Sequence, residues 1–313
     1  MSSVLREDVI VDWITSAFRI EKSDAVAIET SGAGSLVVNV DAFDSEIHWP
    51  PFLSAYMAGR RAYIASTSDV IVKGGKPVAV LVSLRIPSSF SINTVKSFVL
   101  GLESAASELG ARYLGGDTDV ARGGSFRAEV ISIGVPAGKI LHRKGAKPGD
   151  LLAISGCVGT SSVVFKALAG ELDSQLLESA LSDWMSPQWP RLKAWFEVTR
   201  FLSASIDNSD GLALTLHYLA ESSGVRLVLD EIPICSKPLE VLGESGALES
   251  SLYQSGEEYN FVFAFPKEHE WVAEALGARI VGRVVEGRGV YLNGYGEVAK
   301  SGWISGEGYY RRA

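Results

Sequence analysis

Cysteine is scarce in this sequence, which holds only Cys157 and Cys235 among its 313 residues. The two lie far apart, form no CxxC pair and have no histidine at the spacing of a metal ligand. Neither a zinc site nor a disulfide framework is therefore indicated. Each cysteine is predicted to be a buried structural thiol, which is the usual state of a free cysteine in a protein core.

Positive charge is also in short supply, with 29 Lys and Arg against 37 Asp and Glu and a net charge of −8. A protein whose main task is to grip nucleic-acid phosphates normally carries a basic surplus, so we expect no nucleic-acid partner. An acidic protein can still handle phosphates, because its carboxylates can hold Mg²⁺ and the metal then meets the phosphate.

Long apolar runs are absent as well. The most apolar stretch, Val78 to Leu84, is far shorter than the ~20 residues that a membrane helix requires. The first twenty residues include charges such as Arg6 and Asp12 and lack the continuous apolar region of a signal peptide. We therefore expect no membrane partner and a reducing, cytoplasmic location.

Several common catalytic motifs are missing. The sequence has no GxxxxGK[ST] loop and no GxGxxG between a strand and a helix. It also has no HExxH pair and no GxSxG nucleophile elbow. These absences exclude the commonest kinases, dehydrogenases, zinc proteases and serine hydrolases.

What remains is an ordinary globular composition, 47% hydrophobic and 21% charged, at a length that suggests about two domains. Its 32 glycines punctuate alternating strand and helix patterns, which predicts an α/β (α+β) fold. A polar, turn-rich stretch from Leu141 to Asp150 places the domain boundary, giving domains 1–140 and 141–313. The predicted strands are 35–40, 77–86, 126–135, 151–155, 225–229, 259–265 and 278–284, and the predicted helices are 54–72, 92–109 and one from about 161.

Aspartates recur where predicted strands end. They are Asp41 after an apolar run, Asp117 after two glycines, Asp207 and Asp210 before Gly211, and Asp24 and Asp69 at comparable junctions. Carboxylates on loops beside glycines suit Mg²⁺ held against a polyphosphate. Taken alone, each is more typical of a helix cap or a turn. As a set they would repel one another without a cation, which favours a metal site.

Five segments, in order, resemble the motifs of the thiamine-monophosphate kinases of the aminoimidazole-ribonucleotide-synthetase-like superfamily. Ile206-Asp-Asn-Ser-Asp-Gly-Leu212 resembles the DISDGL motif of that family. The other four are Ser68-Asp69 with Lys73-Gly-Gly-Lys-Pro77 (SD…MGA-x-P), Gly115-Gly-Asp-Thr118 (GGDT), Arg143 to Asp150 (R-x-G-A-K-P-G-D) and Ser255-Gly-Glu-Glu-Tyr259 (GGEDY). Each motif alone is weak, but the ordered set extends over nearly the whole chain.

The resemblance implies a two-domain fold in which an N-terminal sheet domain binds ATP and Mg²⁺ and forms a homodimer, while a C-terminal α/β domain closes the ATP cleft. The implied reaction transfers the γ-phosphoryl group of ATP to thiamine monophosphate and gives thiamine diphosphate. The residues it implies are Asp24, Asp41, Asp69, Asp117, Asp207 and Asp210 for Mg²⁺; Gly116, Asp117, Arg143 and Ser209 for ATP; His48, Glu257 and Tyr309 for the thiamine phosphate; and Asp210 with Arg143 for catalysis.

The sequence departs from the family pattern at several of these positions. The Gly-Asp-Asp loop of the family is Lys22-Ser23-Asp24 here, so one carboxylate is missing and an ammonium group is expected near the metals. Asn39 and Val40 stand where the family usually has hydroxyl groups, and Asn208 and Glu258 are milder changes. We therefore expect fewer Mg²⁺ ions than in relatives with the intact pair of carboxylates, with Lys22 contacting phosphate instead. The alternative is that Lys22 points into solvent and changes nothing.

Other interpretations stay open. The glycines between Gly156 and Gly159 could cradle a phosphate at a helix N-terminus, although a tight strand-to-helix turn is the more common use of such a segment. A catalytically weakened paralogue, which binds nucleotide or thiamine phosphate without efficient transfer, is an alternative to the kinase. A hydrogenase-maturation relative would use a C-terminal cysteine, and the last residues, Tyr310 to Ala313, contain none.

Overall fold

The computed structural model describes residues 7–18, 20, 23–30, 34–304 and 308–311, with side chains described for 9–18, 20, 23–30 and 34–303. Its residues divide into two compact units, here called unit N and unit C. Unit N is Asp24–Ile140, and unit C joins Met1–Ser23 to Leu141–Ala313. The N-terminal helix α1 (Glu7–Phe18) thus belongs with the second half of the chain.

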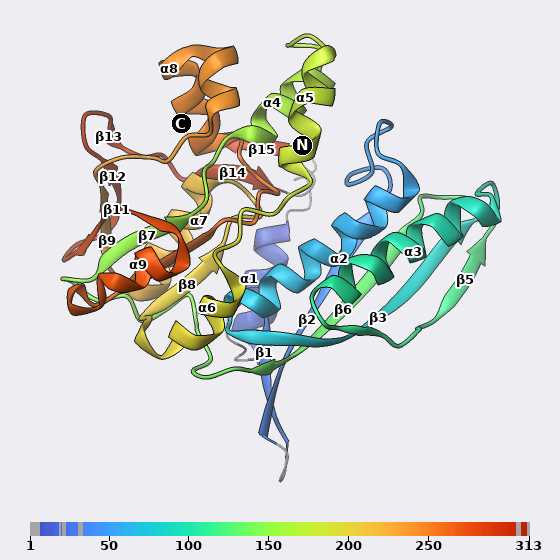
Figure 1. The fold of residues 1–313 in the computed structure, drawn as a ribbon, viewed down its shortest axis with the longest axis horizontal. Helices are drawn as coiled ribbons and strands as arrows, with labels where there is room; N and C mark the ends of the chain where they lie inside the picture. The colour runs from blue at the N-terminus through green and yellow to red at the C-terminus, as the bar shows by residue number, and fades with distance from the viewer. Residues whose placement is uncertain (1–6, 19, 21–22, 31–33, 305–307, 312–313) are drawn as a thin grey trace. The chain divides into compact units, whose positions relative to one another are not determined.

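Unit N is a mainly antiparallel sheet with its two helices on one face (Figure 1). The strands lie in the order β1-β2-β6-β3-β4, and β5 also pairs with β3. The β3–β4 and β3–β5 pairs are parallel and the others are antiparallel. The elements are β1 (Val26–Thr30), β2 (Gly34–Asp44), α2 (Ala55–Val72), β3 (Gly75–Pro87), α3 (Ile92–Glu108), β4 (Arg112–Tyr113), β5 (Thr118–Ala121) and β6 (Arg127–Pro136).

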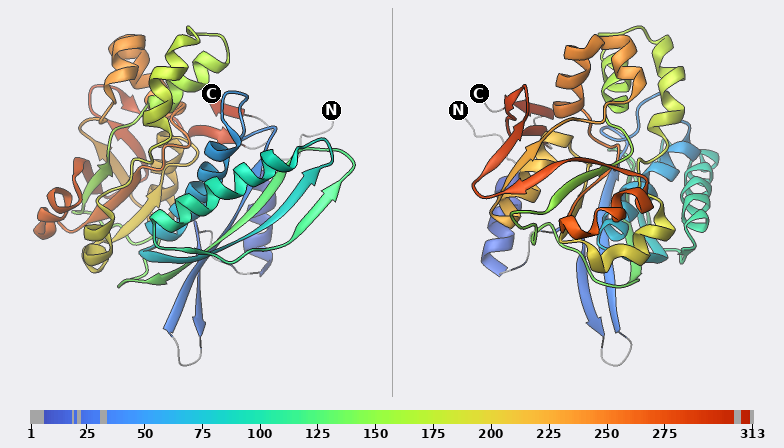
Figure 2. Two further views of the ribbon diagram at one scale, coloured as in Figure 1. Left: turned by 45° about the vertical axis from the view of Figure 1, so that its right-hand side comes forward. Right: turned by 60° about the vertical axis from the view of Figure 1, so that its left-hand side comes forward.

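Alternation along β2 decides which side chains the helices cover. Val37 and Phe43 are buried against residues of α2 and α3, as expected for positions of one parity in a strand. Asn39 and Asp41 share that parity, so they lie on the helix-covered face. Val38 and Val40 have the other parity and therefore lie on the opposite face. Both helices cover the first face of the sheet (Figure 2).

Unit C is built around a seven-stranded sheet in the order β13-β12-β9-β11-β7-β10-β8, in which only the β12–β9 pair is parallel. Strand β10 is buried along its whole length, and Trp195 packs edge-on against Phe261 and Phe263. A separate two-stranded sheet pairs β14 with β15. The elements after α1 are β7 (Leu151–Ser155), α4 (Thr160–Leu168), α5 (Gln175–Trp184), α6 (Leu192–Val198), the 3₁₀ helix η1 (Thr199–Phe201), β8 (Ala204–Asp207), α7 (Leu212–Ser223), β9 (Arg226–Leu229), α8 (Ser236–Tyr253), β10 (Phe261–Phe265), the 3₁₀ helix η2 (Lys267–His269), α9 (Trp271–Leu276), β11 (Ala278–Val285), β12 (Gly289–Leu292), β13 (Gly296–Glu297), β14 (Ser301–Ile304) and β15 (Gly308–Arg311).

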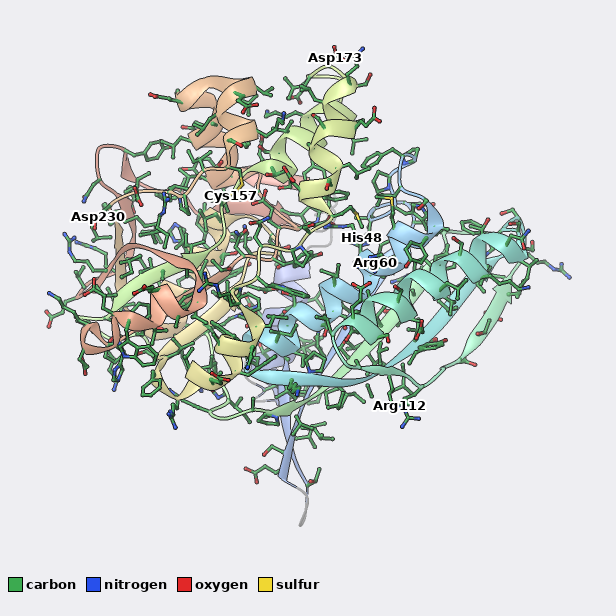
Figure 3. The ribbon with its side chains drawn as sticks, in the orientation of Figure 1. His48, Arg60, Arg112, Cys157, Asp173 and Asp230 are labelled. Carbon is green, nitrogen blue, oxygen red and sulfur yellow. A yellow bond between two sulfur atoms is a disulfide. The ribbon has the colours of Figure 1, made fainter. Side chains whose placement is uncertain are left out.

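The two cysteines are joined in a disulfide, so the prediction of two free buried thiols is wrong (Figure 3). The backbone brings them together: Val158 pairs with Ile234, and the Cys235 N–H donates to the Val158 carbonyl at 2.9 Å. These contacts join residues almost 80 positions apart, and sequence spacing gives no sign of them. The disulfide ties the segment before α4 to the first turn of α8.

Helices α2 and α3 approach each other closely because each has a glycine at the crossing. A Cβ at Gly59 would collide with the Phe98 carbonyl on α3, and a Cβ at Gly101 would collide with the Tyr56 carbonyl on α2. Each glycine therefore admits the backbone of the other helix, at the cost of the lower helix propensity of glycine.

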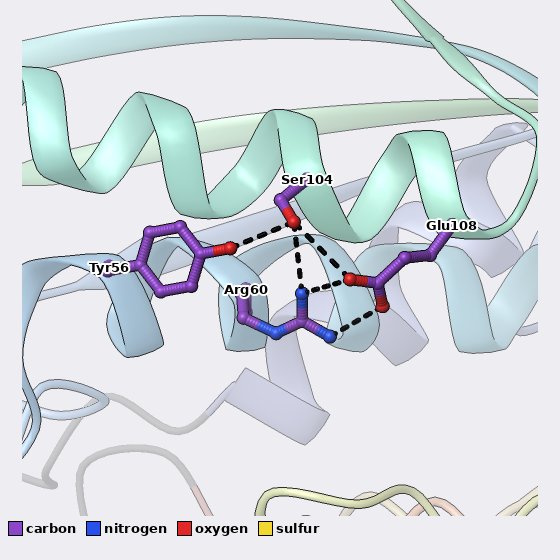
Figure 4. Close-up of polar contacts among 4 residues, drawn as sticks. All are labelled: Tyr56, Arg60, Ser104 and Glu108. Atoms are coloured by element: carbon purple, nitrogen blue, oxygen red, sulfur yellow. Dashed lines mark hydrogen bonds and ion pairs between the residues drawn. The ribbon is translucent and has the colours of Figure 1, made fainter.

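An ion pair at the exposed edge of α2 and α3 joins the same two helices (Figure 4). The Arg60 guanidinium donates to both oxygens of Glu108, at 2.6 and 2.7 Å, and Ser104 bridges Arg60 to the Tyr56 hydroxyl. This hydrogen-bonded pairing raises the pKa of Arg60 and lowers that of Glu108.

None of the helices within the described ranges combines the length and the apolar composition that crossing a membrane would demand.

Candidate functional site

The four candidate aspartates of unit N come from four different segments of the chain. Asp24 precedes β1 and Asp117 precedes β5, both at loop positions. Asp41 and Asp69 do not end strands, contrary to the sequence analysis. Asp41 pairs with Val130 inside β2, because that strand continues to Asp44, and Asp69 lies in the last turn of α2.

The carboxylates of Asp24 and Asp69 lie close together, with oxygen atoms within 4.8 Å of each other. Each has a hydrogen-bond donor or cation from unit N beside it. The Lys73 ammonium is 3.0 Å from Asp24 Oδ2, and the Asn39 amide donates to Asp69 Oδ2 at 2.7 Å. Two carboxylates at this distance favour a positive partner, and here a lysine supplies it.

The Gly115–Thr118 segment follows the edge of β3. The Val82 N–H donates to the Gly115 carbonyl at 3.0 Å, and the Leu84 N–H donates to the Asp117 carbonyl at 2.9 Å. A side chain at Gly116 would collide with the Val82 backbone, and its φ of 151° is one that other residues rarely adopt. The glycine therefore lets the segment lie against β3, where the Asp117 side chain is exposed.

His48 is positioned by its own loop in unit N. Its Nδ1 accepts a hydrogen bond from the Asp44 N–H at 2.9 Å, and its ring lies 5.7 Å from that of Phe43. An accepting Nδ1 places the proton of the neutral ring on Nε2. His48 therefore offers Nε2–H as a donor, which suits an anionic ligand.

In unit C, the residues after β8 form a tightly held turn. Asp207 is buried at the end of the strand, while Ser209 and Asp210 are half-buried. The Asn208 side chain accepts from the Gly211 N–H and donates to the Ser255 carbonyl, at 3.1 and 3.0 Å. Asparagine at this position thus holds the turn in shape and joins it to the segment 255–259.

The segment 255–259, which is hydrogen-bonded to this turn, includes Glu257. The Glu257 N–H donates to the Ser209 carbonyl at 2.7 Å, and the Tyr259 N–H donates to the Asn208 carbonyl at 2.9 Å. Both Glu257 and Tyr259 have positive φ, 59° and 57°, although neither is glycine. Such backbone conformations cost energy and occur where the surroundings enforce them, often at functional sites.

Glu258, between these two residues, is buried at the start of α4. Its carboxylate accepts from the Gly159 N–H at 2.9 Å and from the Ser161 N–H at 2.8 Å. Burial raises the pKa of Glu258 to about 7, although the hydrogen bonds from Ser161 and Gly159 act in the opposite direction. Of the two interpretations of the Gly156–Gly159 segment, the strand-to-helix turn fits, because a protein carboxylate already occupies these N–H groups.

Arg143 lies half-buried in the loop before β7. Its guanidinium is 5.5 Å from the centre of the Tyr218 ring on α7, and its carbonyl accepts from the Ser223 hydroxyl at 3.2 Å. The ring face orients the guanidinium, whose planar set of N–H donors matches the geometry of a phosphate. The position therefore suits binding of a phosphate.

The sequence-derived candidates thus fall into two groups, described here separately. Unit N brings Asp24 next to Asp69, and unit C joins Asp207, Ser209, Asp210 and Glu257 through one turn. The side chain of Tyr309 and the whole of Lys22 lie outside the described residues. Sequence reasoning missed Lys73, although its place in the SD…MGA-x-P motif, where the family has methionine, was a signal.

Comparisons with known proteins identify a family model, relatives and a solved structure that agree with one another. The family model "AIR synthase related protein, N-terminal domain" matches residues 22–135. The thiamine-monophosphate kinase of Pyrococcus horikoshii is 31% identical over 264 residues, 82% of this chain and 81% of that protein. The Aquifex aeolicus enzyme of the same name is 29% identical over 276 residues, 86% and 87% of the two chains. The solved structure of AaThiL complexed with AMPPCP and TMP matches with a TM-score of 0.84 and 26% identity over 96% of this chain and 97% of that one.

Proposed function

Because this chain belongs to the thiamine-monophosphate kinase family, we propose that it transfers the γ-phosphoryl group of ATP to thiamine monophosphate, giving thiamine diphosphate and ADP. The observation that carries the proposal is the match to AaThiL complexed with AMPPCP and TMP over 96% of this chain. AMPPCP is an analogue of ATP, so the two ligands named there correspond to the donor and the acceptor of this reaction.

The chemistry requires positioning and charge neutralisation rather than a strong base. The acceptor is an ionised phosphate, so its attacking oxygen needs no deprotonation, and the main cost of the reaction is bringing anions together. Arg143 in unit C and the His48 Nε2–H in unit N provide positive or donating groups. The catalytic roles proposed here are those of Arg143 and Asp210, with Arg143 neutralising the charge that develops on the transferred group.

Carboxylates in both units suit Mg²⁺. The exposed Asp117 and the half-buried Asp41 and Asp210 are oxygen ligands that can leave room for water and phosphate oxygens, as Mg²⁺ prefers. Asp207 completes the proposed set, whereas Asp24 and Asp69, which the sequence analysis also expected as ligands, are paired with Lys73 and Asn39. When bound, Mg²⁺ neutralises the polyphosphate. Gly116, Asp117 and Ser209 are proposed to contact ATP, and His48, Glu257 and Tyr309 the thiamine phosphate.

A homodimer is proposed from the open face of the unit N sheet. Val40, Ile131 and Leu81 are direct cross-strand neighbours on the face away from α2 and α3, and Val40 is 63% exposed. Val38, Ile133 and Ala79 form the next row, and Val26 continues it onto β1. Two adjoining apolar rows on a sheet face favour packing against a second copy.

We also propose a cytoplasmic location, where ATP is available as the co-substrate. Stable disulfides are uncommon in reducing compartments, with hyperthermophiles as an exception, so the Cys157–Cys235 bond makes the location worth measuring. Trapping thiols during cell lysis and detecting this bond in the cytoplasmic fraction would support the proposal, and finding the protein only outside that fraction would refute it.

The function is tested by incubating the protein with millimolar ATP, Mg²⁺ and thiamine monophosphate and measuring thiamine diphosphate. We expect product from the parent, and Asp117→Asn and Asp210→Asn should each lose most of the Mg²⁺-dependent ATP affinity in calorimetry. Asp119→Asn, two residues along the same exposed segment, is the matched control and should behave like the parent. If the parent binds ATP and thiamine monophosphate but forms no product, it is a binding paralogue. If both Asn variants bind Mg·ATP normally, the metal assignment is wrong.

A further inference from the structure

Lys73 is a buried cation inside the acidic cluster of unit N. Its side chain is 1% exposed and that of Asp24 is 0% exposed, with 3.0 Å between Nζ and Oδ2. Lysine is almost never fully buried unless it is paired, because its ammonium loses the solvation of water. Lys73 caps the C-terminus of α2, where the helix dipole also favours a positive charge.

Asp69, the second carboxylate, lies one helical turn before Lys73 and is held by an amide. Asn39 Nδ2 is 2.7 Å from Asp69 Oδ2 and 3.2 Å from the Ser66 carbonyl oxygen. Both neighbours are oxygen atoms, so the NH₂ end of the amide must face them. Within unit N, the Lys73 ammonium thus forms an ion pair with one carboxylate, and the Asn39 amide donates a hydrogen bond to the other.

These residues do not fit a divalent cation bound through Asp24 Oδ2. Mg²⁺ binds oxygen at about 2 Å, so an ion on this oxygen would lie within a few ångströms of the Lys73 ammonium. Two like charges at that distance in a buried site repel strongly. The exposed Asp117 carboxylate has no such neighbour among the ion pairs found in the described part of the chain.

We propose that the Lys73 ammonium permanently replaces one divalent cation at the Asp24–Asp69 pair. The enzyme then holds fewer metal ions than family members with the methionine of MGA-x-P. The positive charge that a metal ion would supply at this pair of carboxylates is supplied by a side chain of the protein. The identity of the ion, Mg²⁺ with ATP, rests on the proposed function. The replacement itself rests on the geometry of Lys73, Asp24, Asp69 and Asn39.

The test counts metal ions rather than turnovers. Mn²⁺ is titrated into the protein with saturating AMPPCP, and free Mn²⁺ is followed by electron paramagnetic resonance. Lys73→Met, which restores the residue of the family, should bind one more Mn²⁺ per chain than the parent. Its thermal midpoint should fall in EDTA and recover with Mg²⁺. Lys76→Met, an exposed lysine on β3, is the matched control and should leave both quantities at the parent values. An unchanged Mn²⁺ count in a folded Lys73→Met variant would overturn the proposal.

If Lys73→Met does not fold, a second variant tests the same proposal. Asp24→Asn combined with Lys73→Met removes both charges of the buried pair and keeps the net charge. We expect the Mn²⁺ count of the parent, because this variant loses the ammonium together with the Asp24 carboxylate that would hold an additional ion. Loss of one Mn²⁺ would identify Asp24 as a ligand and refute the proposal. Thiamine diphosphate formation by the parent is measured separately, so failure of the proposed function is distinguishable from failure of this inference.

Discussion

Replacing Glu258 with glutamine should change how the stability of the protein depends on pH. Glu258 is 4% exposed, and burial raises its pKa from the ordinary 4.5 to about 7. One oxygen, Oε1, accepts from both the Gly159 and Ser161 N–H groups, and the Gly159 N–H is shared with Oε2 at 2.9 Å. The glutamine carbonyl can accept the same two hydrogen bonds without carrying a charge, so Glu258→Gln imitates the protonated acid.

The direction of the pH effect on stability follows from the number of protons that the folded and the unfolded states bind. Between pH 4.5 and about 7 the folded protein keeps the proton on Glu258, whereas the unfolded chain has released it. The contribution of this group is therefore fully present below pH 4.5 and is lost as the pH rises through about 7. At about 1.4 kcal/mol for each pH unit, the loss between pH 5 and 8 is about 2 to 3 kcal/mol. The glutamine variant has no such loss.

Urea unfolding followed by circular dichroism measures the effect, with parent and Glu258→Gln compared at pH 5 and at pH 8. The difference between the two proteins cancels the other titrating groups, and we expect it to move by about 2 to 3 kcal/mol in favour of glutamine at pH 8. A difference that is constant between the two pH values would refute the reasoning. A constant difference is what a Glu258 held charged by the helix N–H groups would give, because neither state then releases a proton between pH 5 and 8.

Three further predictions concern other parts of the molecule. Replacing Cys157 and Cys235 together with serine should lower the free energy of unfolding by about 4 kcal/mol, because the disulfide closes a loop of 78 residues. If the parent, denatured without reductant, shows two titratable thiols, the disulfide itself is contradicted. Ile131→Glu, at the centre of the open sheet face, should lower the mass seen by light scattering from twice 33.5 kDa to 33.5 kDa, and an unchanged dimer would exclude that face as the interface. Glu257→Asn should stabilise the protein by about 0.5 to 1 kcal/mol, since asparagine tolerates positive φ better than glutamate. The same change should raise KM for thiamine monophosphate. Unchanged stability and an unchanged KM would refute both the backbone strain at Glu257 and its contact with the substrate.

Much of the fold was predictable because hydrophobic periodicity is a local property. The strand predicted at 77–86 is β3 (Gly75–Pro87), and the helix predicted at 54–72 is α2 (Ala55–Val72), with Ser54 as its cap. The apolar positions of both segments follow from burial in a single layer. The α/β class and the family were correct for the same reason, since ordered motifs and alternating elements are read directly along the chain.

The position of Asp41 was wrong because the end of a strand depends on what lies beside it. A polar residue after an apolar run is typical of a strand end. β2 nevertheless continues to Asp44, because Phe43 packs into the core with α2 and α3 and because β6 supplies pairing partners for Asp41 to Asp44. Tertiary pairing outweighed the local signal.

The sequence by itself determined the element types, the acidic character and the ordered motifs, since each is encoded within a few neighbouring residues. Contacts between distant segments were decided only by the tertiary structure. The disulfide requires the approach of Val158 and Ile234, and the cation beside Asp24 comes from Lys73, 49 positions along the chain. A buried lysine and an exposed one have the same letter in a sequence. Which of them replaces a metal ion depends on the desolvation and the charge around it, and these exist only once the chain has folded.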